Sequence, residues 1–244
     1  GVDTKYVAVN EGIPTNYHFV LWYEDDRTIL IRHEAYPYAL PKNFEPPRWI
    51  YLSSIGENSE IFHSELAEWL TKHPETKLAF QPGTFQMEMG KEKLAQLYAC
   101  TELVACNKEE AERILEIGPP AGEASETDIR ELLKKMHGLG PKIVLITNGV
   151  NGACASNGDE LFKIPVYPDP KPPIDRTGAG DASSSSIVAA LAIRKPLQEA
   201  LLWGPVNAMS VVQEIGAQKG LLSRDALEKF LADAPANYRV ELLT

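Results

Sequence analysis

The sequence is poor in cysteine and in positive charge, and it contains no long hydrophobic run. Its 244 residues include only three cysteines, Cys100, Cys106 and Cys154, without C-x-x-C spacing, so we expect neither a disulfide framework nor a cysteine zinc site. The formal net charge of −10 disfavours binding to nucleic acid or to an anionic membrane. No stretch approaches the roughly 18 apolar residues of a membrane span, and the first residues lack a signal-peptide pattern. These features predict a cytoplasmic protein that acts on small molecules.

The motifs of several common enzyme classes are also absent. The sequence contains no G-x-x-x-x-G-K-[ST], no early G-x-G-x-x-G, no G-x-S-x-G and no H-E-x-x-H. The sequence therefore gives no motif support for assigning the chain to the P-loop NTPases, Rossmann dehydrogenases, α/β-hydrolases or zinc proteases. Surface or lid positions are expected for the five histidines, which show no pairing at ligand spacing: His18, His33, His63, His73 and His137.

The first 40 residues are rich in β-branched and aromatic side chains. Strand-like runs occur in KYVAV, YHFVLWY and TILI, and the acidic turn at residues 24–27 separates the last two, which predicts an antiparallel hairpin. We expect residues 1–40 to form a small β unit and residues 41–244 to form the main domain. Four aromatic residues could stack on a base or a sugar, or pack within strands or between two copies of the unit: Trp22, Tyr23, Tyr36 and Tyr38.

From residue 49 onward, short apolar runs alternate with helix-length amphipathic segments. WIYLSS, KLAFQ, ELVAC and KIVLITNG read as strands, and we expect helices over 59–72, 88–99, 108–117 and 126–137. This alternation predicts an α/β fold with a parallel sheet covered on both faces. Farther on, Asn157-Gly158 predicts a two-residue hairpin turn. Four more helices are expected over 181–193, 197–203, 206–214 and 223–232, the last with Ser223 as its N-cap.

The segment Thr177-Gly178-Ala179-Gly180-Asp181 precedes an apolar helix and carries the clearest chemical signal. Free N–H groups at a helix N-terminus, next to glycines that lack a Cβ atom, bind phosphate well. A carboxylate there opposes the charge of the ligand, unless it accepts a proton from a hydroxyl that attacks the phosphate. Asp181 is therefore either the general base of a phosphoryl transfer or a cap of the helix, and the spacing leaves both open.

Residues 175–191, DRTGAGDASSSSIVAAL, resemble the C-terminal signature of ribokinase-like (PfkB) sugar and nucleoside kinases. Three further blocks match in the family's order. Residues 107–110 resemble its N-x-x-E motif, residues 146–153 its T-x-G-x-x-G turn, and residues 207–217 its last nucleotide-pocket helix. Residues 1–31 are similar to the stretch that forms the family's β lid. The resemblance implies a three-layer α/β/α sheet with a small β lid near the N-terminus.

The resemblance also implies roles for individual residues. Asp181 would be the catalytic base, and Gly178, Ala179 and Gly180 would cradle the transferring phosphoryl group. ATP would be the donor, and Asn107 and Glu110 would organise Mg²⁺ through water. The other implied contacts to the nucleotide fall on Thr147, Gly149, Gly152, Thr177, Gly216 and, in the adenine pocket, Asn207. A monovalent cation such as K⁺ would lie near Asp175, Thr177 and carbonyls close to Gly216.

The chain also departs from the family's pattern. The family's first strand, its early Asp and its G-G-x-x-x-N block lie upstream of GVDT, which is residue 1 here. We therefore expect the N-terminal strands to be missing, either because the chain is a fragment or because another chain completes the acceptor site. Gln81 stands where the family has Asp and Asn, and it cannot act as a carboxylate.

Two further departures fall in the signature itself. Arg176 replaces a usual Thr, and it could reach a phosphate or an acidic substrate group, or pair with Asp169 or Asp175. Residues 183–186 are all serine, and they could cap the helix, contact phosphate or pack as small side chains.

These observations predict an ATP-dependent phosphotransferase that moves the γ-phosphate to a hydroxyl of a sugar or ribosyl nucleoside. Its partners would be ATP and that small acceptor, with no nucleic acid and no membrane, and a homodimer could form through the β lid. Two other hypotheses stay open. One is a catalytically impaired nucleotide-binding module or assembly subunit with the kinase fold, and the other is a kinase for a vitamin precursor.

Overall fold

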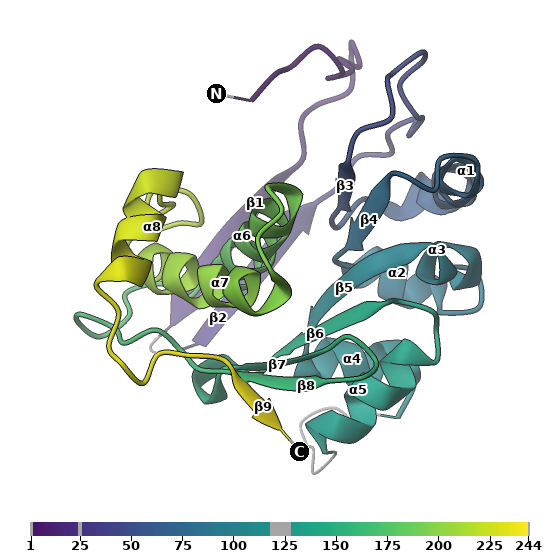
Figure 1. The fold of residues 1–244 in the computed structure, drawn as a ribbon. Helices are drawn as coiled ribbons and strands as arrows, with labels where there is room; N and C mark the ends of the chain where they lie inside the picture. Colours follow the sequence, from purple (N-terminus) through teal and green to yellow (C-terminus); the bar gives the residue numbers. More distant parts are fainter. Residues whose placement is uncertain (1, 24–25, 118–127, 244) are drawn as a thin grey trace.

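The computed structural model describes residues 2–23, 26–117 and 128–243. They form a two-stranded sheet of order β1-β2 and a seven-stranded sheet of order β3-β4-β5-β6-β7-β8-β9 (Figure 1). Strands β3 to β6 run parallel, whereas β6 to β9 pair antiparallel. Helices lie on both faces of the larger sheet, so the chain has the three-layer α/β/α architecture that the sequence predicted.

The strands are β1 (Tyr17–Tyr23), β2 (Asp26–Arg32), β3 (Trp49–Leu52), β4 (Lys77–Phe80), β5 (Thr101–Asn107), β6 (Ile143–Thr147), β7 (Ala153–Ser156), β8 (Leu161–Ile164) and β9 (Glu241–Leu243). The α-helices are α1 (Glu60–Lys72), α2 (Thr84–Met89), α3 (Ala95–Ala99), α4 (Lys108–Leu115), α5 (Ile129–His137), α6 (Ala179–Ala192), α7 (Leu197–Val211) and α8 (Arg224–Ala232). Short 3-10 turns span Glu57–Ser59 and Gly149–Asn151. Among the described residues, no helix has the length and apolar character needed to cross a membrane.

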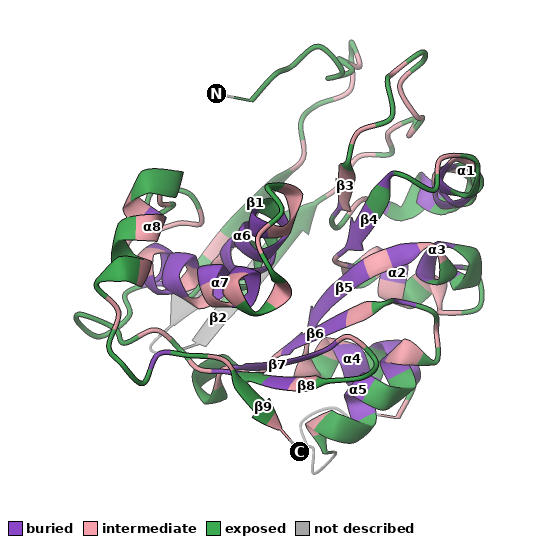
Figure 2. Ribbon diagram, in the orientation of Figure 1, coloured by how far each residue is buried: buried purple, intermediate pink, exposed green. Residues whose placement is uncertain are grey.

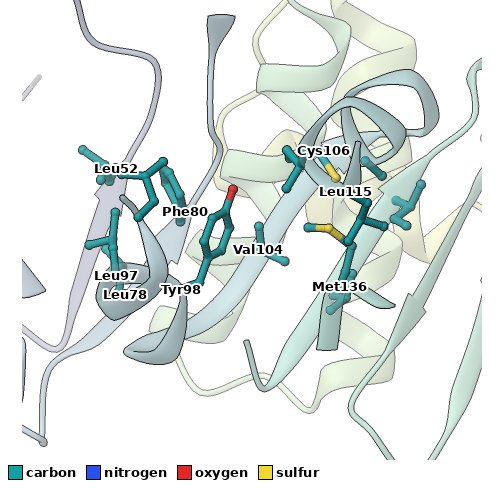
Figure 3. Packing of buried hydrophobic residues seen from close by; sticks show 14 of the residues in the cluster. Leu52, Leu78, Phe80, Leu97, Tyr98, Val104, Cys106, Leu115 and Met136 are labelled. Carbon is teal, nitrogen blue, oxygen red and sulfur yellow. The ribbon is translucent and has the colours of Figure 1, made fainter. Parts of the chain in front are cut away.

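The central strands bury both of their faces, which explains their near-continuous apolar sequences. In β4, Phe80 packs with α1, α3, α4 and α5 on one face, whereas the neighbouring Ala79 packs with α6 and α7 on the other. Val104 in β5 and Met136 in α5 belong to the first of these clusters (Figure 3). Because successive side chains of a strand point to opposite faces, each such strand needs apolar residues at every position.

The hairpin β1-β2 forms a sheet of its own, as the sequence predicted, and it is more exposed than the main sheet (Figure 2). Directly after β2, the ring of His33 packs against the ring of Phe85 in α2 in a T-shaped arrangement, with centroids 5.0 Å apart. The predicted strand KYVAV is wrong, because residues 5–9 form a turn and irregular chain. The predicted turn residues Glu24 and Asp25 lie outside the described residues, and the side chains of Trp22 and Tyr23 are likewise not described.

One histidine expectation is wrong. His18 and His33 lie in the β unit, as expected, and their rings stack with the Nε2 atoms 3.3 Å apart because β1 and the end of β2 lie side by side. His63, in contrast, is buried in α1 rather than lying on the surface, and its Nδ1 lies 2.6 Å from the carbonyl oxygen of Ser59. Its burial depends on contacts between elements, which sequence spacing does not encode. All three cysteines are free thiols.

The structure corrects several predicted helix boundaries. The single helix expected over 88–99 is two helices, α2 and α3, with Gly90 between them at a φ of +89°. The two helices expected around Pro205 are one continuous helix, α7. Proline removes one backbone hydrogen bond and disfavours a helix interior. Here Trp203 and Val206 on either side are buried, so packing of the helix offsets that cost.

The loop between β7 and β8 is longer than predicted. Ser156 pairs with Leu161, so four residues rather than two connect the strands. Only Gly158 has a positive φ, and the side chain of Asn157 accepts hydrogen bonds from the N–H groups of Asp159 and Glu160. Strand β9, at the edge of the sheet beside β8, was not predicted. Its three residues pair only with β8, which is distant in the sequence.

Candidate active site

The loop before α6 is held against a second loop by close packing and by one buried carboxylate. Gly178 is the N-cap of α6 at a φ of +82°, and a Cβ atom there would lie 2.5 Å from the Cβ of Ala217. The carboxylate of Asp175 accepts hydrogen bonds from Thr177 N at 2.8 Å and from Gly216 N at 3.0 Å. Asp175 therefore fixes the loop at 175–178 to residues 216–217.

The N-terminus of α6 leaves backbone donors available. The N–H groups of Gly180 and Asp181 have no acceptor within hydrogen-bonding distance among the described residues. A Cβ atom added at Gly180 would meet nothing within 4 Å, so the approach to this backbone is open. Unpaired N–H groups at the positive end of a helix dipole attract anions.

Asp181 is the third residue of α6, and the N-cap position belongs to Gly178, so the hypothesis of a simple cap is wrong. The exposed Asp181 side chain lines a cavity of about 440 Å³. Its Oδ1 atom accepts a hydrogen bond of 2.7 Å from Nε2 of Gln81. Other lining residues of this polar cavity are Tyr51, Ser53, Ser54, Gly83, Glu110, Ala217 and Leu221.

Asn107 and Glu110 begin helix α4 directly after β5. They form a reciprocal capping box, in which Asn107 Oδ1 accepts from Glu110 N at 2.7 Å and Glu110 Oε2 accepts from Asn107 N at 2.8 Å. Burial raises the pKa of Glu110, the negative charges of Asp181 and Glu109 raise it further, and the N–H of Asn107 opposes these effects. Two carboxylates thus face one cavity, an arrangement that a cation would stabilise.

A second cavity of about 340 Å³ lies on the other side of the loop that leads into α6. Arg176 and Ala179 line this cavity, whereas Asp181 and Ala182 line the polar one. Its walls are largely apolar and come from Gly149, Val150, Val166, Tyr167, Pro173, Pro205, Ala208, Met209 and Val212, with Asp169 as an acidic member.

The remaining predicted nucleotide residues do not all reach these cavities. Gly149 lines the apolar cavity, and Thr147 ends β6 beside Asn107. Gly152 shapes the turn after β6, since a Cβ atom there would lie 2.3 Å from the carbonyl oxygen of Ile164. Asn207 is buried away from the cavity, where its amide donates to Ser186 Oγ at 2.8 Å and accepts from Leu222 N at 2.9 Å.

Three serines of the run in α6 pack as small buried side chains, whereas Ser185 is exposed and lines the polar cavity. Ser183 and Ser186 are buried, and a Cβ atom at Gly204 in α7 would lie 2.6 Å from Ser183 Oγ. Arg176 lines the apolar cavity together with Asp169. Within the part of the chain that the structure describes, no group of three or more histidine, cysteine or acidic side chains forms a metal cluster.

Sequence reasoning missed Tyr51 as a residue of the site, and it noted Gln81 only as a departure from the family's pattern. The position of Gln81 at the carboxyl end of a strand was the available signal. Gln81 directly follows β4, just as Asn107 ends β5 and Thr147 ends β6. The carboxyl ends of parallel strands meet at one edge of a sheet, where α/β proteins bind their ligands.

Known proteins are similar to this chain in sequence and in fold. The chain is 30% identical over 139 residues to the ATP-dependent 6-phosphofructokinase of Thermoanaerobacterium thermosaccharolyticum, covering 57% of this chain and 40% of that protein. It is 27% identical over 180 residues to the nucleoside kinase of Methanocaldococcus jannaschii, covering 69% and 55% of the two chains. The solved nucleoside kinase of Burkholderia thailandensis, in complex with inosine, superposes with a TM-score of 0.74 at 16% identity, covering 98% of this chain and 75% of that one.

The chain thus spans about half the length of these two curated relatives or less. The sequence profile of the pfkB family carbohydrate kinases matches residues 1–224, which is most of the chain. The chain therefore belongs to the pfkB family of carbohydrate kinases.

Proposed function

We propose that this chain carries the nucleotide-binding and catalytic parts of an ATP-dependent kinase whose acceptor is a hydroxyl of a sugar or a ribosyl nucleoside. The observation that carries the proposal is the N-terminus of α6. Its unpaired N–H groups lie between an apolar cavity and a polar one, and the Asp181 carboxylate lines the polar cavity. Kinases in the same family and of the same fold support this assignment.

In the proposed reaction, Asp181 acts as the general base. The acceptor hydroxyl occupies the polar cavity and its oxygen forms a bond to the γ-phosphorus, while the bond from that phosphorus to the β-γ bridging oxygen breaks and ADP leaves. The hydroxyl proton passes to the Asp181 carboxylate. Oδ1 of Asp181 accepts from Gln81, so Oδ2, which has no partner among the described residues, is the atom that takes the proton.

The transferring phosphoryl group would lie against Gly178, Ala179 and Gly180. The donors are the free N–H groups of the first turn of α6, and the absence of a side chain at Gly180 gives the phosphate oxygens access to them. These donors are already fixed by the contacts of Asp175 and Ala217, so they need little reorganisation during the reaction.

ATP would place its base in the apolar cavity beside Gly149 and direct its phosphates past Arg176 toward α6. Thr147 at the end of β6, together with Thr177 and Gly216 on the loops, would lie around this path. Asn207 would act only by supporting α7. The three free thiols and the use of ATP favour a cytoplasmic location.

Mg²⁺ fits the acidic pair in the polar cavity. Glu110 and Asp181 line it together and repel each other, and Mg²⁺ prefers oxygen ligands with several waters retained. Asn107 and Glu110 would hold the ion through water, and the ion would neutralise charge on the phosphates. K⁺ would lie beside Asp175, where the carboxylate and loop carbonyls supply oxygen.

The proposed activity is tested by measuring ADP formation from ATP and Mg²⁺ with a panel of neutral sugars, sugar phosphates and nucleosides. We expect at least one acceptor to stimulate ADP formation and to appear as its phosphate ester by mass spectrometry. A nucleotide-binding module without catalysis is the second candidate. Calorimetric ATP binding without stimulated turnover for any acceptor would support the module instead.

The hairpin β1-β2 would mediate a homodimer. Phe19 and Leu30 face each other across the strands on one side of the hairpin, and Ile31 lies on the other, all more than half exposed at 61%, 51% and 56%. An isolated two-stranded ribbon is marginally stable, so a second copy is a suitable cover.

We expect light scattering to show a dimer for the unaltered chain and a monomer for Phe19→Ser combined with Leu30→Ser. Ile61→Ser, at a 75% exposed position on α1, is the matched control and should leave the mass unchanged. A monomeric unaltered chain would remove this part of the proposal.

A further inference from the structure

Gln81 links the Asp181 carboxylate to the main sheet. The residue follows β4, and its backbone N–H donates to the carbonyl oxygen of Leu52 at 2.9 Å, which continues the pairing with β3. Its side-chain Nε2 donates to Asp181 Oδ1 at 2.7 Å. The two residues are 100 positions apart, so this contact joins the end of β4 to the first turn of α6.

The other end of the Gln81 amide is also engaged. The hydroxyl of Tyr51, on β3, donates to Gln81 Oε1. Reversing the amide would turn its oxygen toward the Asp181 carboxylate, so that two acceptors would face each other. The Tyr51 hydroxyl and the carboxylate therefore fix the orientation of the amide between them.

Tyr51 is suited to the role of a permanent donor. Burial raises the pKa of its hydroxyl, and the negative charge of Asp181 raises it further, while a hydrogen bond with Ser184 acts in the opposite direction. Because the hydroxyl stays protonated at neutral pH, Tyr51 keeps donating to Gln81 under the conditions in which a base must work.

We propose that Tyr51 and Gln81 are positioning residues for the base: through one chain of hydrogen bonds they hold the Asp181 carboxylate in place, with Oδ2 directed to the acceptor hydroxyl. This inference rests on the proposed function, in which Asp181 takes the proton. Because Gln81 occupies Oδ1, the second carboxylate oxygen is left for the acceptor.

The chemistry of an amide explains why a glutamine occupies this position. A carboxylate at residue 81 would stand at hydrogen-bond distance from Asp181, and two like charges so close cannot both stay ionised. An amide supplies a donor without adding a charge.

Two substitutions of Gln81 test the inference through separate measurement of kcat and KM. Gln81→Met removes the donor with similar volume, and we expect kcat to fall by about 10- to 100-fold while the KM for ATP stays nearly unchanged. Gln81→Glu replaces the donor by a repelling carboxylate and should lower kcat at least as far. Tyr51→Phe should produce a smaller fall in kcat. ATP binding should stay within about twofold for all three, since neither residue lines the apolar cavity.

Gln96→Met, on the exposed side of α3, is the matched control and should leave both kcat and KM unchanged. Thermal unfolding checks that each variant is folded. If the unaltered chain transfers phosphate and the Gln81 variants keep its kcat, the inference is overturned while the proposed function stands.

If no acceptor is phosphorylated, the proposed function fails, and the inference is tested without turnover. The ¹³C signal of the Asp181 carboxyl carbon is then compared at neutral pH in the unaltered chain, in Gln81→Met and in Gln96→Met. A signal that is displaced only in Gln81→Met supports the contact between residues 81 and 181 as the determinant of the position of the Asp181 carboxylate. Coincident signals overturn it.

Discussion

Asp181→Asn should lower phosphoryl transfer by about 10²- to 10⁴-fold and leave ATP affinity nearly unchanged. Asparagine keeps the size of the side chain, and its Oδ1 can still accept the hydrogen bond from Gln81 Nε2. What it loses is the ability to take a proton from the acceptor hydroxyl. Steady-state rates with the best acceptor, together with calorimetric titration of ATP, measure the two effects separately.

A matched change of charge nearby serves as the control. Glu109→Gln removes one negative charge at an exposed position beside Glu110 and outside the lining of the polar cavity. We expect its turnover to stay within about twofold of the unaltered chain, because a screened surface charge contributes little. Turnover of Asp181→Asn equal to that of Glu109→Gln would contradict the assignment of the base.

The fold was predictable where the local pattern and the tertiary environment agree. Strand β5 reads as a strand because residues 103–106 form a continuous apolar run, and the structure buries both of its faces. Helix α7 was divided in the prediction because Pro205 is a local breaker, whereas the burial of its neighbours keeps the helix continuous. The short strand β9 carries no local signal of its own, since it exists only by pairing with β8.

The candidate site was likewise predictable where it depends on local patterns of sequence. The capping box of Asn107 and Glu110 and the glycine-rich start of α6 are local patterns, so the sequence identifies them. The contact between Gln81 and Asp181 depends on how the sheet brings two distant segments together, and no spacing encodes it. For the same reason the interior position of Asn207 emerges only from the structure, where its amide bridges α6 and the loop before α8.

The glycines of the α6 loop have separable roles in folding and in binding. At Gly178 the backbone is left-handed, and an added Cβ atom would lie 2.5 Å from the Cβ of Ala217. At Gly180 the backbone is helical and the added atom would meet nothing within 4 Å, although it would enter the space assigned to the phosphoryl group. One residue thus shapes the loop and the other leaves room for the ligand.

Gly178→Ala should therefore lose both stability and activity. The left-handed backbone costs an alanine about 1–2 kcal/mol, and displacement of the loop from residues 216–217 moves the phosphate donors, for which we expect turnover to fall by about 100-fold. Gly180→Ala should lower turnover to a similar degree without loss of stability, because alanine is favoured in a helix. Chemical denaturation and steady-state rates measured on the same preparations distinguish the two effects.

Gly158→Ala is the control for backbone strain alone. Gly158 also has a positive φ, +95°, but an added Cβ atom there meets nothing within 4 Å, and the residue lies in the loop between β7 and β8, outside both proposed binding cavities. We expect it to lose stability and to keep full turnover. If Gly180→Ala also kept full turnover, the phosphoryl group would not approach the first turn of α6 as closely as the proposed mechanism requires, and the donors of that turn would have to serve another part of the ligand.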